Sequence, residues 1–133
     1  MIEQGIAKLV QGNAAVAAIA TAGGGFLVQL PKGQLDQGPT WTMSVITDPA
    51  DYTLAGESDL RDTTIQIDVF AKDAATVIGL ARAINTVLAG FRGTLSDADG
   101  VAVTGIFQIG KTDYFDEAGR TFRRMLEYQI FHN

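Results

Sequence analysis

The strongest local pattern in this chain is a strand followed at once by a helix. Within Thr63–Ala71 every second position is apolar, which is the period-two pattern of a strand with one buried face. Over residues 73–91 the apolar positions recur at helical spacing, with Asp73 as a plausible N-cap and Gly90 or Gly93 as the stop. We therefore expect a helix that packs on the apolar face of a sheet.

Alternation also predicts the remaining strands. These are residues 26–30, 41–46, 101–109 and 121–131. Two short helices are expected at the N-terminus, with Asn13 as the N-cap of the second and Gly23-Gly24-Gly25 as its stop. Residues 48–60 are predicted to be a long connection, and residues 113–119 a polar, hairpin-like one.

Together these elements predict an α+β fold in one domain spanning residues 1–133. The expected architecture is an antiparallel sheet of about four to five strands with one long helix packed on a face. The short N-terminal helices are expected to pack at the side or end of the sheet. The length of 133 residues is enough for one core without disulfide or metal support.

Composition excludes several kinds of chemistry. The chain has no cysteine and one histidine, His132, so thiolate sites and histidine-based triads are ruled out or poorly supported. The net charge of −5 argues against a protein that binds nucleic-acid phosphates. We expect no enzyme activity, no cofactor and no metal. No segment has the pattern of a signal peptide or a membrane span, so we expect a soluble, unprocessed chain without a membrane partner.

One segment matches a nucleotide-binding motif. Gly105–Thr112 fits the P-loop pattern G-x-x-x-x-G-K-[ST], in which glycine-rich backbone and a following helix hold phosphates. Here the four middle residues are bulky and alternate as in a strand, and acidic residues follow instead of an amphipathic helix. We interpret the segment as a strand running into a turn and keep nucleotide binding as a remote alternative.

Apolar side chains exceed what a small two-layer monomer needs. Phe70, Met125 and Phe131 fall on the polar faces of their strands, and Tyr52 and Leu54 lie in the long connection. Such a surplus suggests burial against another chain. An equally good explanation is that the N-terminal helices cover the second face of the sheet.

The charged residues of the strands have two interpretations. Arg120, Arg123 and Arg124 could form a basic docking patch for an acidic partner, although ordinary salt bridges within the sheet are slightly favoured. Asp68 and Glu127 could serve in acid/base chemistry, but pairing with neighbouring arginines or with solvent is the better interpretation.

Several short segments, taken in order, resemble a known family. They are Y52-T-L-A-G56, I65-Q-I-D-V-F-A71, L88-A-G-F-R-G93, G105-I-F107, Y114-F-D116 and R123-R-M-L-E-Y128. The order and content of these segments resemble the small tail-completion, or tail-terminator, proteins of long-tailed phages and gene transfer agents. The resemblance spans nearly the whole chain, and the I-D-V-F strand with its helix and G-F-R-G is its most specific part.

The resemblance implies a structural virion protein of the tail or neck, assembled in the host cytoplasm. Such a protein forms a ring, usually hexameric, that caps the head-proximal end of the tail tube. Its expected partners are further copies of itself, the tail-tube protein and the head–tail connector or stopper protein. DNA is expected to pass through the lumen without specific binding. Candidate inter-subunit or tail-tube contacts are Tyr52, Leu54, Phe70, Arg123, Met125 and Phe131. A head-closure or minor tail protein is the alternative.

Overall fold

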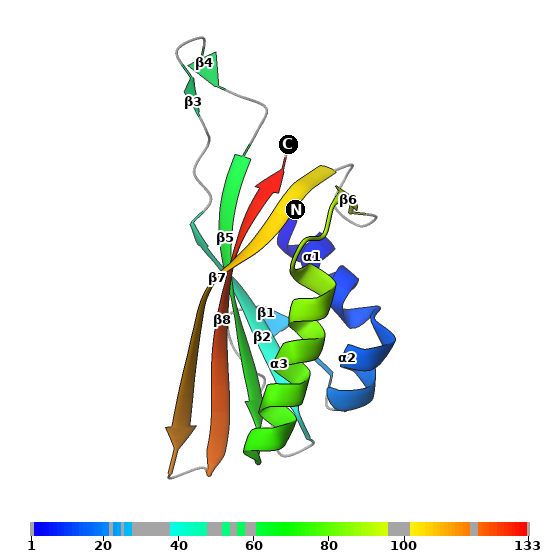
Figure 1. The fold of residues 1–133 in the computed structure, drawn as a ribbon, viewed down its shortest axis with the longest axis vertical. Helices are drawn as coiled ribbons and strands as arrows, with labels where there is room; N and C mark the ends of the chain where they lie inside the picture. The colour runs from blue at the N-terminus through cyan, green and yellow to red at the C-terminus, as the bar shows by residue number, and fades with distance from the viewer. Residues whose placement is uncertain are drawn as a thin grey trace.

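The computed structural model (Figure 1) shows an α+β fold built on one curled sheet. It describes residues 2–21, 23–24, 26–27, 38–47, 52–53, 56–57, 61–95, 102–117 and 120–132. Statements below concern these residues.

The main sheet has six strands in the order β1-β2-β5-β8-β7-β6. Their bounds are β1 Phe26–Leu27, β2 Thr40–Thr47, β5 Arg61–Ala71, β8 Thr121–His132, β7 Ala102–Asp116 and β6 Gly93–Thr94. Every neighbouring pair is antiparallel except β1 and β2, which run parallel. The predicted antiparallel sheet is confirmed, with two differences: β1, the first of the predicted strands, runs parallel to β2, and the two-residue strand β6 was not predicted.

The three helices lie on one face of this sheet (Figure 1). They are α1 Ile2–Gln11, α2 Ala14–Ile19 and α3 Ala74–Leu88. The predicted N-caps are confirmed, because Asn13 Oδ1 accepts the N–H of Val16 and Asp73 Oδ1 accepts the N–H of Thr76. At the end of α3, Gly90 adopts φ +79°, so it is the glycine that stops the helix.

A single apolar core fills the space between the helices and the sheet. Its largest fully buried side chains include Trp41, Met43, Ile65, Ile67, Leu80, Ile84, Leu126, Tyr128 and Ile130. The apolar alternation predicted for residues 63–71 and 121–131 is confirmed, since each strand turns these residues toward α3. We call this the helix face of the sheet, and the opposite side the outer face.

The N-terminal helices do not cover the outer face. They pack beside α3, and α1 also contacts β2 on the helix face, where Ile6, Val10 and Val16 join the core. The suggestion that these helices bury the second apolar face is therefore wrong. Their small residues, alanines above all, allow close packing between helices but leave too little apolar surface to cover a second face.

Two predicted connections are partly strands. Asp113–Asp116 belongs to β7, whose residues pair with β8 as far as Asp116 and Thr121, so the polar connection predicted at 113–119 is too long. Asp113 forms an ion pair with Arg124 on the neighbouring strand. This pairing makes the polar residues 113–116 compatible with a sheet. Within 48–60, Tyr52–Thr53 (β3) and Gly56–Glu57 (β4) form a two-stranded hairpin that stands clear of the main sheet (Figure 1). Residues 28–30 of the first predicted strand lie outside the described residues.

Candidate functional site

Four of the six predicted contact residues share the outer face, with Phe70, Arg123 and Met125 near one end of the β5–β8 pair and Phe131 near the other end. Phe70 pairs with Arg123 across β5 and β8, and Met125 and Phe131 follow at alternate positions along β8. All four side chains are half-buried. Tyr52 lies apart from them in β3, and Leu54 lies outside the described residues.

Arg123 is the centre of an outer-face cluster. Its guanidinium lies 3.1 Å from Asp68 Oδ1, and its Cζ atom lies 5.9 Å from the Phe70 ring centre and 5.1 Å from that of Tyr114. Asp68 Oδ2 accepts a further hydrogen bond from Gln66 Nε2 at 3.0 Å. The Asp68 carboxylate is thus fully engaged, which confirms a salt bridge at this position instead of acid/base chemistry.

The neighbouring arginines do not form one basic patch. Arg124 points to the helix face, where its Nε donates to Asp113 Oδ1 at 2.6 Å and its Nη2 to Oδ2 at 3.1 Å. This bidentate contact holds the pKa of Asp113 below its usual range. Arg120 sits in the β7–β8 turn with φ +48°. The favoured interpretation, salt bridges within the sheet, is confirmed for Arg123 and Arg124.

Strand β7 carries exposed apolar side chains on both of its faces, and these were not predicted from the sequence. Phe107, Ile109, Tyr114 and Phe115 are about half exposed, at 55%, 52%, 48% and 47%. Phe107 also packs edge-on against Phe131, with ring centres 5.9 Å apart. This contact extends the outer-face cluster toward the other end of β8.

Irregular pairing of β7 with β8 explains why simple alternation along residues 101–109 does not predict which face Phe107 occupies. The register of β7 against β8 shifts between Val103 and Gly105, and again between Gln108 and Gly110. The first shift buries Val103 and Ile106 and turns Phe107 outward, so the simple alternation predicted for 101–109 is wrong beyond Val103. The glycines Gly105 and Gly110 are the sequence signal for these shifts.

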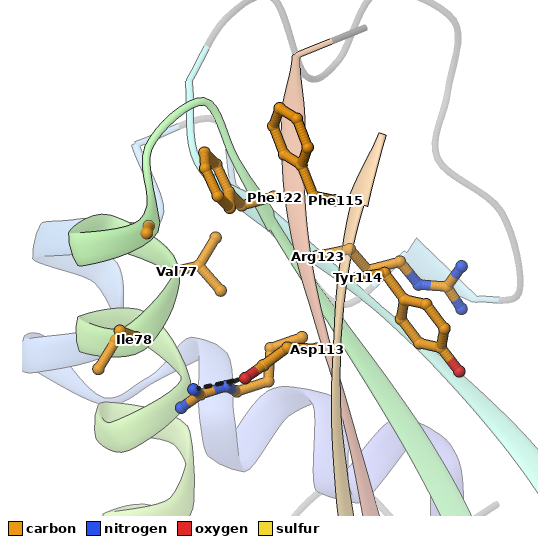
Figure 2. Close-up of a pocket in the computed structure, with 9 residues that line it drawn as sticks. Val77, Ile78, Asp113, Tyr114, Phe115, Phe122 and Arg123 are labelled. Atoms are coloured by element: carbon orange, nitrogen blue, oxygen red, sulfur yellow. Dashed lines mark hydrogen bonds and ion pairs between the residues drawn. The ribbon is translucent and has the colours of Figure 1, made fainter. Parts of the chain in front are cut away.

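A groove separates α3 from β7 on the helix face, and we call it the α3 groove. Its wider part has a volume of about 310 Å³ and lies beside Ala74, Val77, Ile78, Phe115 and Phe122. In Figure 2 Val77, Ile78, Phe122 and Asp113 lie on the α3 side of the β7–β8 hairpin, whereas Tyr114 and Arg123 point to the other side. The rings of Phe115 and Phe122 lie 4.5 Å apart.

The α3 groove continues along the helix as a narrower, polar part. This part has a volume of about 170 Å³ and lies beside Ala81, Arg82, Asn85, Gln108, Lys111, Arg124 and Leu126. Arg124 borders both parts and lies between them.

The P-loop-like segment has the wrong geometry for phosphates. Gly105–Thr112 lies wholly within β7 and pairs with β8, so its backbone is extended instead of curled around an anion. The chain continues as strand beyond Thr112, so the turn predicted there is wrong, and no helix N-terminus faces the glycines. This finding excludes the nucleotide-binding alternative.

Neither a metal cluster nor a membrane helix is found in the described part of the chain. No group of three or more His, Asp or Glu side chains is placed to hold an ion among the residues given above. None of the helices described there is long and apolar enough to span a bilayer.

An exposed apolar strand and a cation–aromatic cluster are typical of a structural protein that acts through contacts with other chains. The comparisons agree with this class. Residues 4–133 match the family model described as "Tail completion protein gp17". The chain therefore belongs to the Tail completion protein gp17 family, which is a family of structural virion proteins and not of enzymes.

A solved structure shows the same fold. A chain in the structure described as "Virion of native gene transfer agent (GTA) particle" aligns with a TM-score of 0.66 and 18% sequence identity, covering 98% of this chain and 93% of that chain. No curated protein matches the sequence. The expected family, fold class and virion origin are confirmed.

Proposed function

We propose that this protein is the tail terminator of its particle. It forms a ring, expected to be hexameric, that caps the head-proximal end of the tail tube and joins the tail to the head connector or stopper protein. The observation that carries the proposal is the family match over residues 4–133, together with the shared fold of a chain in a gene transfer agent virion.

The surfaces of the molecule support a ring of this kind. In a ring each subunit presents two different surfaces to its two neighbours, and the ring closes if their rotation closes. The outer-face cluster around Arg123 and the α3 groove are different surfaces, available for contacts with the tail tube and with further copies of the chain. Because the two axial sides of a ring differ, tube subunits add to one side only, and elongation stops there.

The net charge suits a conduit for DNA. At −5 per subunit, a ring of several copies repels the phosphates of DNA that pass through its lumen. DNA then passes through without specific binding, in agreement with the absence of a basic face expected from the composition.

A tube-elongation assay tests the proposal. Tail-tube subunits of the same particle are polymerised with and without this protein, and the tubes are viewed by electron microscopy. We expect shorter tubes with this protein at one end only. Tubes of unchanged length contradict the terminator role, and unchanged tubes together with binding to the connector identify a head-closure protein instead.

Matched variants connect the assay to the outer face. Phe107→Ala and Tyr114→Ala each remove an exposed ring from β7 and are expected to reduce tube capping while the fold is retained. Val45→Ala is the control, since Val45 is also partly exposed, at 36%, but lies on β2 and on the helix face. Equal capping by all three variants contradicts a role for the outer-face cluster.

A further inference from the structure

The α3 groove exists because α3 covers only part of the sheet. The helix packs mainly over β5 and β8, and its contact with β7 is slight. The helix-face side chains in the second half of β7, among them Lys111, Asp113 and Phe115, are therefore exposed. On its far side β7 pairs with β6 only at Ala102 and Val103, so the described part of the sheet offers a long strand edge beside the groove.

The groove has a definite chemical character. Its wide part is apolar, with Ile78 38% exposed and Phe115 47% exposed. Its narrow part is cationic, because Arg82 and Lys111 are exposed and Arg124 lies between the two parts. A fitting occupant carries one or two large apolar side chains and several carboxylates, and it is extended so that it can follow the β7 edge.

One segment of this chain has these properties. Residues 48–60, which we call the arm, contain the carboxylates of Asp48, Asp51, Glu57 and Asp59 and no basic residue. They also contain Tyr52 and Leu54, and the described parts of the arm, β3 and β4, are extended. The arm is thus complementary to the groove in charge, and its described strands have the extended backbone that the β7 edge requires.

The arm cannot reach the wide, apolar part of the groove in its own chain. It follows β2 and precedes β5, and β3 and β4 stand at the opposite end of the molecule from the β7–β8 turn (Figure 1). The wide part of the groove lies level with Ala71, which is ten residues, or about 33 Å, along β5 from Arg61. Leu54 is seven residues from Arg61, so it reaches at most about 25 Å.

We propose that the arm of one copy binds in the α3 groove of the next copy. Tyr52 and Leu54 occupy the apolar part beside Ile78 and Phe115, and the carboxylates of the arm face Arg82 and Lys111. The contact is head-to-tail, so it repeats around a ring. This inference rests on the ring of the proposed function and names the surfaces that close it.

Disulfide trapping tests the contact. Because the chain has no cysteine, no native thiol can form a competing disulfide. Leu54→Cys and Ile78→Cys are introduced together in the full-length protein, which is oxidised and run on a non-reducing gel. We expect a ladder at multiples of 14.1 kDa that ends at the ring size. Mixing the two single variants is expected to give a dimer, which shows that the bond joins different copies.

A matched control defines the specificity. Ala75→Cys replaces Ile78→Cys, since Ala75 is exposed on the same helix but does not line the groove. The control pair is expected to give at least tenfold less cross-linked product. Equal cross-linking of Ala75→Cys and Ile78→Cys, or no interchain disulfide with either, overturns the proposal.

Charge reversal gives a second, independent readout. Arg82→Glu with Lys111→Glu is expected to abolish the ring mass in native mass spectrometry while circular dichroism shows an intact fold. Adding Asp51→Lys and Glu57→Lys is expected to restore the ring. If the ring survives the charge reversal, and Leu54→Cys with Ile78→Cys forms no interchain disulfide, the arm–groove contact is overturned and the terminator role still stands. Trapped rings that fail to stop tube growth overturn the terminator role alone.

Discussion

Gly24 lies directly against the indole ring of Trp41, which is only 1% exposed. The backbone is fixed at this point by two hydrogen bonds. Gln11 Nε2 donates to the Gly24 carbonyl at 2.7 Å, and Thr40 Oγ1 donates to the Gly23 carbonyl at 2.9 Å. The segment that follows α2, which ends at Ile19, therefore closes the core over the largest buried side chain of β2.

This packing predicts that Gly24→Ala destabilises the fold. A Cβ at position 24 would overlap the Trp41 ring, so either the backbone or the indole must shift. We expect the free energy of unfolding to fall by about 1–3 kcal/mol, which is the usual cost of overpacking. Urea denaturation, monitored through the fluorescence of Trp41, measures this change in the free energy of unfolding. An unchanged midpoint would show that the contact is looser than described.

Gly79→Ala is the matched substitution, and it is expected to raise the free energy of unfolding instead of lowering it. Gly79 lies within α3, and a Cβ there meets Ile19 Cδ1 at 3.9 Å, an ordinary contact distance. Alanine has the higher helix propensity, so we expect a gain of about 0.5–1 kcal/mol in the same denaturation experiment. A loss at this position would contradict the helix packing between α2 and α3.

The buried hydroxyl of Tyr128 is expected to make the stability of the fold depend on pH in the alkaline range. Its hydroxyl donates to Asn85 Oδ1 at 3.0 Å, and burial raises its pKa well above the usual 10.0. The unfolded chain therefore loses this proton at a lower pH than the folded chain does. Its contribution to stability is present below about pH 10 and is lost as the pH rises further.

Tyr128→Phe separates this group from the other tyrosines. At neutral pH we expect the variant to be about 1 kcal/mol less stable, because the hydrogen bond to Asn85 is lost. Above about pH 10 the difference between the two proteins should shrink, since only the parent loses the Tyr128 contribution. Unfolding curves collected at several pH values test this, and a constant difference would contradict it.

The extended geometry of Gly105–Thr112 predicts that ATP does not bind. Calorimetric titration with Mg-ATP is expected to give no heat of binding, and Lys111→Ala is expected to behave like the parent. Saturable binding that disappears in Lys111→Ala would show that the segment adopts a phosphate-binding loop after all.

The sequence was sufficient to predict the regular elements. Strands β5 and β8 alternate without interruption, as does β2 as far as Val45, and α3 carries both its N-cap Asp73 and its stop Gly90. The placement of Phe70, Met125 and Phe131 on one face follows from this alternation alone.

The irregular elements could not be predicted in the same way. Each β-bulge inserts a residue in β7 and moves the following side chains to the other face, and alternation in one strand carries no information on its partner's register. The α3 groove likewise depends on where α3 crosses the sheet. That position is set by packing against α2, β5 and β8, which are distant in sequence.

The mass of the assembled protein tests the ring most directly. Native mass spectrometry of the full-length protein, alone and with tail-tube subunits, is expected to give a closed species of about six subunits of 14.1 kDa each. The same species should be found once per tube. A monomer under both conditions, or an open series of masses without an end point, would contradict the account.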